Sequence, residues 1–167
     1  YPNITVIGRV GSNDMLELVI AHEVGHNWFY GILGSNERDH AWMDEGTTSF
    51  YENKYMEIKY PFDNITTNFQ TKTNKTSISI NANKILGIEN ISGNFIYNLA
   101  CRFNAVKKAD HPVDFPSEEY TSLNYGIIVY KKAAVIFEYL QTYLGEELFE
   151  KCMQTYFEKW KFRHPYP

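Results

Sequence analysis

Two histidines spaced four residues apart, His22 and His26, constrain this 167-residue chain more than any other feature. Residues four apart on an α-helix lie one turn above each other, so a helix here places both imidazoles on one face. Glu23 completes the pattern His-Glu-x-x-His, in which the two rings can bind one zinc ion and the glutamate can act as a general base. Glu45, separated from His26 by eighteen residues, can supply the third ligand and leave one coordination position open for water.

The residues around the histidines favour a metal site over the alternative, two histidines that are only solvated or hydrogen-bonded. The neighbours are apolar and predict a helix that is buried on most sides: Val19, Ile20, Val24, Trp28 and Phe29. Burial of two histidines and a glutamate costs free energy unless something binds them. We therefore expect one zinc ion at His22, His26 and Glu45.

Composition excludes several other classes of protein. The length fits one domain with a real core. The net charge of −4 and the lack of a basic run predict that nucleic acid is not a partner. No stretch of about eighteen apolar residues exists, so no membrane span is expected. Cys101 and Cys152 imply no disulfide framework and are interpreted as two small buried thiols.

The sequence predicts a mostly helical chain. Ser12 or Asn13 can cap the first helix, and Pro61 stops the second, which carries Glu45 in its first turn. Helices are expected over residues 12–30, 41–60, 93–108, 126–144 and 146–162.

The remaining segments give weaker signals. Residues 3–10 are β-rich and predict a short strand, whereas residues 62–90 show only a strand-like run at 77–80. The last helix carries an apolar stripe that we interpret as core: Leu148, Phe149, Cys152, Tyr156, Phe157 and Trp160.

Three ordered motifs resemble one family of enzymes. Residues 26–31, His-Asn-Trp-Phe-Tyr-Gly, resemble a His-x-Trp-Phe-Gly run, and residues 42–46, Trp-Met-Asp-Glu-Gly, resemble Trp-Leu-Asn-Glu-Gly with Asp44 in place of the usual asparagine. Residues 124–134 resemble a Tyr-x-Lys-Gly-Ala block. These motifs, and the eighteen-residue spacing, are similar to those of the zinc aminopeptidases (gluzincins) related to alanyl aminopeptidase and leukotriene hydrolase. Residues 160–165 resemble the end of the catalytic lobe in bacterial members.

The resemblance implies a mainly α-helical catalytic lobe of a thermolysin-like zincin, with a short strand remnant at the N-terminus. It implies a zinc-dependent aminopeptidase that hydrolyses the N-terminal peptide bond of a peptide substrate. Glu23 is then the general base, and Tyr130 stabilises the tetrahedral intermediate, although a packing role for Tyr130 is the alternative. Glu45 is expected to help bind the substrate's N-terminus as well as zinc. Tyr125 has an aromatic counterpart in some relatives and is a candidate for substrate binding.

Two further aspartates, Asp39 and Asp44, are candidates for orienting the ligand histidines, with helix capping as the alternative.

The family's exopeptidase motif, Gly-x-Met-Glu, lies before the zinc helix in relatives and is not found here. Residues 1–3, Tyr-Pro-Asn, resemble the residues that directly follow it. We therefore expect residues 1–167 to be a single helical catalytic lobe excised from a larger multidomain aminopeptidase, with flanking domains as partners. Such a fragment is expected to be incomplete for activity. Two alternatives stay open: an endopeptidase on the same zinc site, and a zinc-stabilised, non-catalytic domain that binds peptides.

Overall fold

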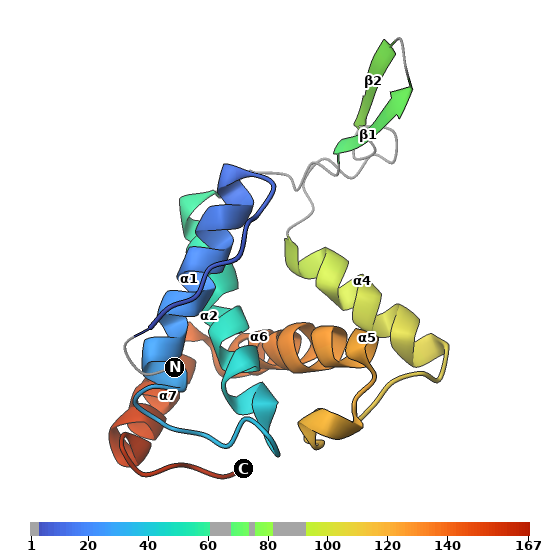
Figure 1. Cartoon of the computed structure of the whole chain (residues 1–167). Helices are drawn as coiled ribbons and strands as arrows, with labels where there is room; N and C mark the ends of the chain where they lie inside the picture. The colour runs from blue at the N-terminus through green and yellow to red at the C-terminus, as the bar shows by residue number, and fades with distance from the viewer. Residues whose placement is uncertain (1–3, 61–67, 74–75, 82–92) are drawn as a thin grey trace.

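A computed structural model describes residues 4–60, 68–73, 76–81 and 93–167 of the chain. The described part is mainly α-helical, as the sequence predicts (Figure 1). Its elements are α1 (Asn13–Phe29), the 3₁₀ turn η1 (Ala41–Met43), α2 (Glu45–Lys59), β1 (Asn68–Thr73), β2 (Thr76–Asn81), α4 (Gly93–Val106), the 3₁₀ turn η2 (Ser117–Glu119), α5 (Ser122–Asn124), the π-helix η3 (Tyr125–Lys132), α6 (Ala133–Leu144) and α7 (Glu146–Trp160). None of the described helices is long and apolar enough to cross a bilayer.

Helices α1 and α2 lie side by side (Figure 1). α1 carries the His-Glu-x-x-His motif of residues 22–26, and α2 begins with Glu45. The Ser12 side chain accepts a hydrogen bond from the Met15 amide at 3.2 Å and caps α1 where the sequence predicts. Gly25 lets the two helices approach closely, because a Cβ at this position would lie 2.8 Å from Cγ2 of Thr48.

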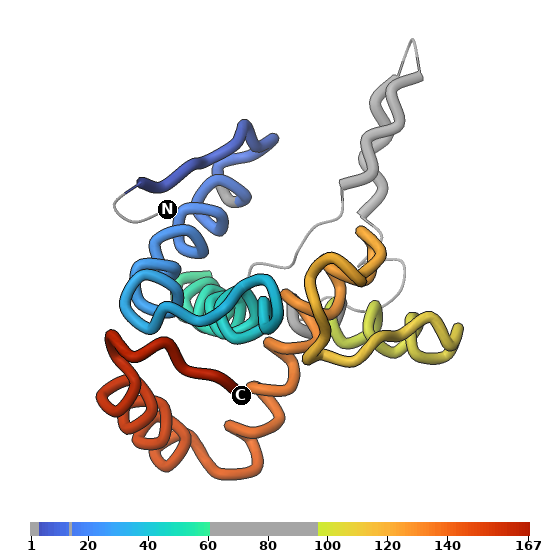
Figure 2. The backbone as a smooth tube through the Cα atoms, turned by 60° about the horizontal axis from the view of Figure 1, so that its bottom comes forward, coloured from blue at the N-terminus to red at the C-terminus, as the bar shows by residue number. Residues whose placement is uncertain are grey.

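The core lies where α2 meets η3, α6 and α7 (Figure 2). One cluster contains Phe50, Ala134 and Phe149, and a second contains Ala41, Tyr120, Ile128 and Val129. Gly46 lies at the junction, since a Cβ there would lie 2.4 Å from Cβ of Ala133. The first turn of α2, which carries Glu45, is thus packed closely against η3 and the start of α6.

The strand-like run at 77–80 lies within β2. β1 and β2 form an antiparallel hairpin whose register runs from Asn68 opposite Asn81 to Thr73 opposite Thr76. The strand predicted at residues 3–10 is wrong for the described residues 4–10, which have no regular secondary structure. A β-rich sequence needs a neighbouring strand for its backbone hydrogen bonds, and none pairs with it in the part that the structure describes.

Two expectations of burial are also wrong. The outer face of α1 is open: Ile20, Val24 and Trp28 are 40%, 42% and 48% exposed. On α7 Phe149 is fully buried, but Leu148 and Cys152 are exposed. On α7 the periodicity identifies the apolar side, but other described elements cover only part of it. α1 has apolar residues on most sides, and described elements do not cover the side that carries Ile20, Val24 and Trp28. Cys101 and Cys152 are free thiols, as expected, but the expectation that both are buried is wrong, because Cys152 is exposed and Cys101 is only partly buried.

The helix predicted over 126–144 is formed, but its first half is wound differently. Residues 125–132 are a π-helix, which continues into the α-helix α6. π-Helical turns place residues five apart above one another and are frequent at functional sites. This winding bears on Tyr125 and Tyr130, which are five apart.

Candidate metal centre

The structure brings together the three side chains that the sequence nominates as metal ligands. One ligand atom from each of His22, His26 and Glu45 lies within 4.8 Å of the other two. Nε2 of His22 lies 3.0 Å from Oε2 of Glu45, and Nε2 of His26 lies 3.4 Å from the same oxygen. α1 supplies both imidazoles, one turn apart, and the first residue of α2 supplies the carboxylate.

The opposite nitrogen of each imidazole is held by a second carboxylate. Nδ1 of His22 lies 2.7 Å from Oε2 of Glu52, and Nδ1 of His26 lies 2.7 Å from Oδ1 of Asp44. Asp44 is one of the two aspartates nominated from the sequence. The other, Asp39, is elsewhere, because its carboxylate accepts a hydrogen bond from the Asn36 side chain.

Sequence reasoning places Glu52 on the same side of the second helix as Glu45 but assigns it no role in the site. Its signal is spacing: it lies seven residues after Glu45, or about two helical turns, and therefore on the same face of α2.

The electrostatics of the cluster favour paired charges. Burial by itself lowers the pKa of His22, but hydrogen bonds with Glu45 and Glu52 raise it to about 9. Burial also opposes the charge of His26, whose hydrogen bonds with Asp44 and Glu45 raise its pKa to about 10. Burial raises the pKa of Glu45, but the two imidazoles lower it to about 2. Without a metal the cluster is thus held by imidazolium–carboxylate pairs.

A further acid contacts Asp44 from the loop before η1. The hydrogen bond with Asp44, followed by burial and the charges of Asp44 and Glu45, raises the pKa of Glu37 to about 8. This shift favours the protonated form of Glu37 beside Asp44.

The donor set fits zinc. Two imidazole nitrogens and one carboxylate oxygen are the ligands of catalytic zinc sites, in which a fourth position stays open. Glu23 follows His22 on α1 and is half-buried, and its carboxylate has no hydrogen-bond or ion-pair partner among the described residues. It is thus available to exchange a proton.

The π-helix η3 brings two tyrosines to the ligands. The Tyr130 ring lies 5.7 Å from the His22 ring, and the Tyr125 ring lies 5.9 Å from the Tyr130 ring, edge to face. The pKa of Tyr130 is raised above its ordinary value, chiefly by burial and also by the negative charge of Glu45 and a hydrogen bond with that carboxylate. Its hydroxyl therefore keeps its proton and can donate. Tyr125 packs against Tyr120 on its far side.

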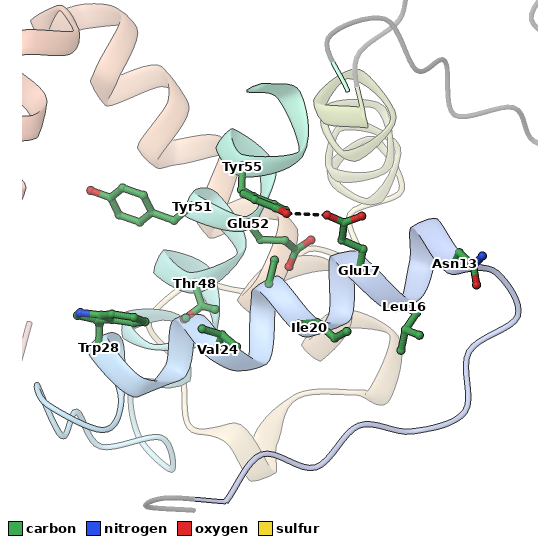
Figure 3. Close-up of a pocket in the computed structure, with 12 residues that line it drawn as sticks. Asn13, Leu16, Glu17, Ile20, Val24, Trp28, Thr48, Tyr51, Glu52 and Tyr55 are labelled. Atoms are coloured by element: carbon green, nitrogen blue, oxygen red, sulfur yellow. Dashed lines mark hydrogen bonds between the residues drawn. The ribbon is translucent and has the colours of Figure 1, made fainter. Parts of the chain in front are cut away.

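A groove of about 670 Å³ opens on the outer side of the same two helices (Figure 3). Its apolar walls are Leu16, Ile20, Val24, Trp28, Tyr51 and Tyr55. It does not contain the three ligands, although Glu52 contributes to its lining. The groove and the metal centre therefore lie on different sides of α1, and Glu52 borders both.

Comparison with known families identifies the relationship. Residues 8–165 match the model of the peptidase family M1 domain. The chain belongs to peptidase family M1. The match covers all the elements that build the metal centre and confirms the resemblance to zinc aminopeptidases seen in the sequence motifs.

The M1 relatives come from plants, bacteria and animals. The chain is 22% identical to aminopeptidase M1-B of Oryza sativa over 94% of its length, and 24% identical to aminopeptidase N of Lactococcus lactis over 92%. It is 26% identical to endoplasmic reticulum aminopeptidase 2 of Homo sapiens over 87%. The aligned region is only 15%, 16% and 13% of these relatives. The M1 domain described here therefore spans about one seventh of each relative's length.

Proposed function

We propose that this M1 domain is the catalytic lobe of a zinc-dependent aminopeptidase. The observation that carries the proposal is the convergence of His22, His26 and Glu45 within 4.8 Å, in a peptidase family whose members use zinc. These three residues hold the ion. When bound, zinc supplies Lewis-acid activation of water and polarisation of the scissile carbonyl.

Glu23 is the general base. Its carboxylate is adjacent to the ligand helix face and has no competing partner among the described residues. It accepts a proton from the attacking water and returns it to the leaving amine. Proton transfer of this kind contributes a factor of about 10² to 10⁴ to the rate.

Tyr130 donates its hydroxyl proton toward the carbonyl oxygen as negative charge develops there. The raised pKa of the phenol supports this role, because only the protonated form can donate. Glu45 faces Tyr130 and also helps to bind the substrate's N-terminal amine. Tyr125 extends the aromatic wall beside Tyr130 and contacts the bound peptide.

The whole protein, we infer, is larger than this lobe. The relatives place the matching region within much longer chains, which supports flanking domains that complete the substrate site. The domain assignment 1–167, a single helical lobe that works with those partners, follows from this proposal.

The test is Glu23→Gln in the native full-length protein. Glutamine keeps the volume but cannot accept the proton, so kcat for an aminoacyl reporter should fall by about 10² to 10⁴ while zinc content stays near one ion. Glu147→Gln, an exposed charge removal on α7, is the matched control and should leave kcat unchanged.

Three outcomes contradict the proposal in different ways. Unchanged turnover of the Glu23 variant removes it from the mechanism. Cleavage of an N-acetylated peptide at least as fast as the free peptide indicates an endopeptidase. Peptide binding without cleavage by the zinc-loaded wild type indicates a non-catalytic domain.

A further inference from the structure

The lysine of the Tyr-x-Lys-Gly-Ala block, Lys132, has no part in the proposed chemistry, yet its ammonium group makes two contacts with one short segment. Nζ donates to Oδ2 of Asp110 at 2.6 Å and to the backbone carbonyl of His111 at 3.2 Å. Lys132 is the last residue of the π-helix η3. These contacts therefore join the C-terminal end of η3 to residues 109–111.

The residue that precedes η3, Asn124, contacts the same segment. Its Nδ2 donates to the backbone carbonyl of Ala109 at 2.7 Å, and its Oδ1 accepts from the side chain of Asn104 at 2.7 Å. Asn104 and Asn124 are only 6% and 4% exposed. Water cannot readily replace these hydrogen bonds, so loss of one would leave a buried polar group without a partner.

Residues 109–111 are themselves attached to α4. The backbone carbonyl of Asn104, near the end of α4, accepts from the Ala109 amide at 3.2 Å. α4 also packs against η3, where the ammonium group of Lys131 lies 4.1 Å from the centroid of the Tyr97 ring. The segment that receives both ends of η3 is thus anchored to a neighbouring helix.

Attachment of both ends constrains how η3 is wound. The Cα atoms of residues 109 and 111 lie at most about 7 Å apart, so Asn124 and Lys132 are tied to nearby points. A π-turn closes its hydrogen bonds over five residues and an α-turn over four, so eight residues form a shorter segment as a π-helix. π-Helices are rare and mostly one turn long, and the shorter segment is the one that suits two nearby anchors.

η3 also contacts the elements of the metal centre. A Cβ on Gly46, the residue after Glu45, would lie 2.9 Å from the backbone carbonyl oxygen of Val129 in η3. The Tyr130 ring lies 5.7 Å from the His22 ring. α1 and α2 hold the ligands, whereas η3 holds Tyr130, so rewinding of η3 would displace the phenol relative to the ligands.

We propose, on the basis of the proposed function, that Asn124 and Lys132 are positioning residues that tie both ends of η3 to residues 109–111 and thereby place the Tyr130 hydroxyl at the substrate. Their side-chain polar groups bind residues 104–111, so they act on Tyr130 through the winding of η3. Their loss should slow catalysis while the three zinc ligands stay in place.

Lys132→Met in the native full-length protein removes the ammonium group and keeps the aliphatic stem. Displacement of a reacting group by about 1 Å costs up to about 100-fold in rate, so kcat for an aminoacyl reporter should fall about 10- to 100-fold, with zinc affinity within about twofold of the wild type. Lys132→Arg keeps the charge and the donors and should recover most of the loss. Asn124→Ala should act in the same direction, and if it does not fold, Lys132→Met alone decides.

A double variant with Tyr130→Phe gives a readout that a merely structural role would not move. If Lys132 acts through the Tyr130 hydroxyl, Lys132→Met should lower kcat by less than about twofold once that hydroxyl is absent. An equal fall in both backgrounds would overturn the proposal. The matched control is Lys161→Met, which breaks an exposed ion pair with Glu158 at 2.6 Å and should leave kcat unchanged.

Hydrogen exchange measured by mass spectrometry reports the winding of η3 without any need for activity. Peptides that cover residues 125–132 should exchange at least about tenfold faster in Lys132→Met than in the wild type, because the π-helical hydrogen bonds open more often. Peptides from α1 should exchange at the wild-type rate. Unchanged exchange in η3 would show that the lysine does not hold this helix.

Two results distinguish failure of this proposal from failure of the proposed function. If Tyr130→Phe alone leaves kcat unchanged, the proposed function of Tyr130 is wrong and its positioning has no catalytic purpose. If Tyr130→Phe lowers kcat but folded Lys132→Met changes neither kcat nor the exchange of η3, the positioning proposal is overturned and the proposed function stands.

Discussion

Tyr130 lies where its side chain could serve as a packing residue, as a hydrogen-bond donor to the substrate, or as both. It is half-buried between the His22 ring and the Tyr125 ring, and its hydroxyl interacts with Glu45. A purely structural tyrosine needs only its ring for these contacts. Removal of the hydroxyl alone therefore distinguishes the two roles.

Tyr130→Phe should lower kcat for an aminoacyl reporter by about 10² to 10³, because one donor to the developing oxyanion is lost. Zinc affinity and the melting temperature should change little, since the ring and its packing remain. Steady-state kinetics with parallel chelator competition measure both. The control is Tyr139→Phe, which removes the hydroxyl of an exposed tyrosine in α6. If zinc affinity falls by the same factor as kcat, the hydroxyl of Tyr130 acts on metal binding and not on the oxyanion.

At the scale of single residues, part of the candidate metal site can be predicted from the sequence. His22 and His26 are one helical turn apart, so local geometry alone places them together. Glu45 is nominated by motif spacing, and its arrival at the histidines depends on how α2 packs against α1. The orientation of Asp44 toward His26 and of Glu52 toward His22 depends on that same packing, which no local pattern expresses.

The close contact between α1 and α2 near His22 and His26 depends on the glycine at position 25. The Cγ2 atom of Thr48 occupies the space where a Cβ on Gly25 would lie. The two helices can approach at this point only because residue 25 has no side chain.

Gly25→Ala should destabilise the chain by on the order of 1 kcal/mol, because overpacking of about 1 to 3 kcal/mol exceeds the helix-propensity gain of about 1. Thr48→Ser removes Cγ2 and keeps the hydroxyl, so the double variant should recover the loss. Urea unfolding of the wild type, both single variants and the double variant gives the coupling free energy. Additive effects would show that the contact does not limit the approach.

The opposite end of the same helix pair is joined by a polar clamp. Glu17 of α1 accepts hydrogen bonds from Lys59, Tyr55 and Tyr60 around the end of α2. The pKa of Glu17 is lowered from 4.5 to about 2, chiefly by the hydrogen bond from Lys59 and also by those from Tyr55 and Tyr60. A carboxyl with a lowered folded-state pKa stabilises the fold above its ordinary pKa and loses that contribution as the pH falls through the folded-state value.

Glu17→Gln should therefore lower the melting temperature at neutral pH, and the gap from the wild type should close as the pH falls from 4.5 toward 2. Thermal melts across this range, with Glu147→Gln for comparison, measure the gap. A gap that stays constant with pH would mean that the hydrogen bonds, and not the charge, hold the clamp.

Helix positions follow from the sequence because caps, glycines and prolines act locally. Ser12 begins α1 and Gly145 precedes α7, both where expected. Burial is less predictable, because an apolar stripe indicates which side of a helix avoids water but not what covers it. The π-winding of η3 is hidden for a related reason: its residues give the same apolar pattern as an ordinary helix.

Across the whole molecule, large apolar side chains remain exposed on several helices. They include Ile20 and Trp28 on α1, Phe103 on α4 and Tyr143 on α6. Within the residues that the structure describes, the core around α2 therefore leaves much apolar surface uncovered, and a bound ion that joins α1 to α2 should contribute measurably to stability.

Zinc at about 100 times its dissociation constant should stabilise the folded chain by about 2.7 kcal/mol, which corresponds to a rise in melting temperature of roughly 5 to 10 °C. A chelator should reverse the rise, and magnesium should not reproduce it. Differential scanning fluorimetry measures the shift, with His22→Ala as the variant that should not respond. An equal response of that variant would place the stabilising ion elsewhere.

The π-helix has a consequence for how this chain tolerates insertions and deletions. Five residues along an ordinary α-helix turn through roughly 140° beyond a full revolution, so Tyr125 and Tyr130 would face apart. Ordinary winding at the present length would therefore turn Tyr125 away from Tyr130, whereas loss of one amino acid from residues 126–129 would leave the two tyrosines four apart and again on one face. The number of residues in this stretch is thus matched to its π-winding, and a change in one without the other separates the two rings.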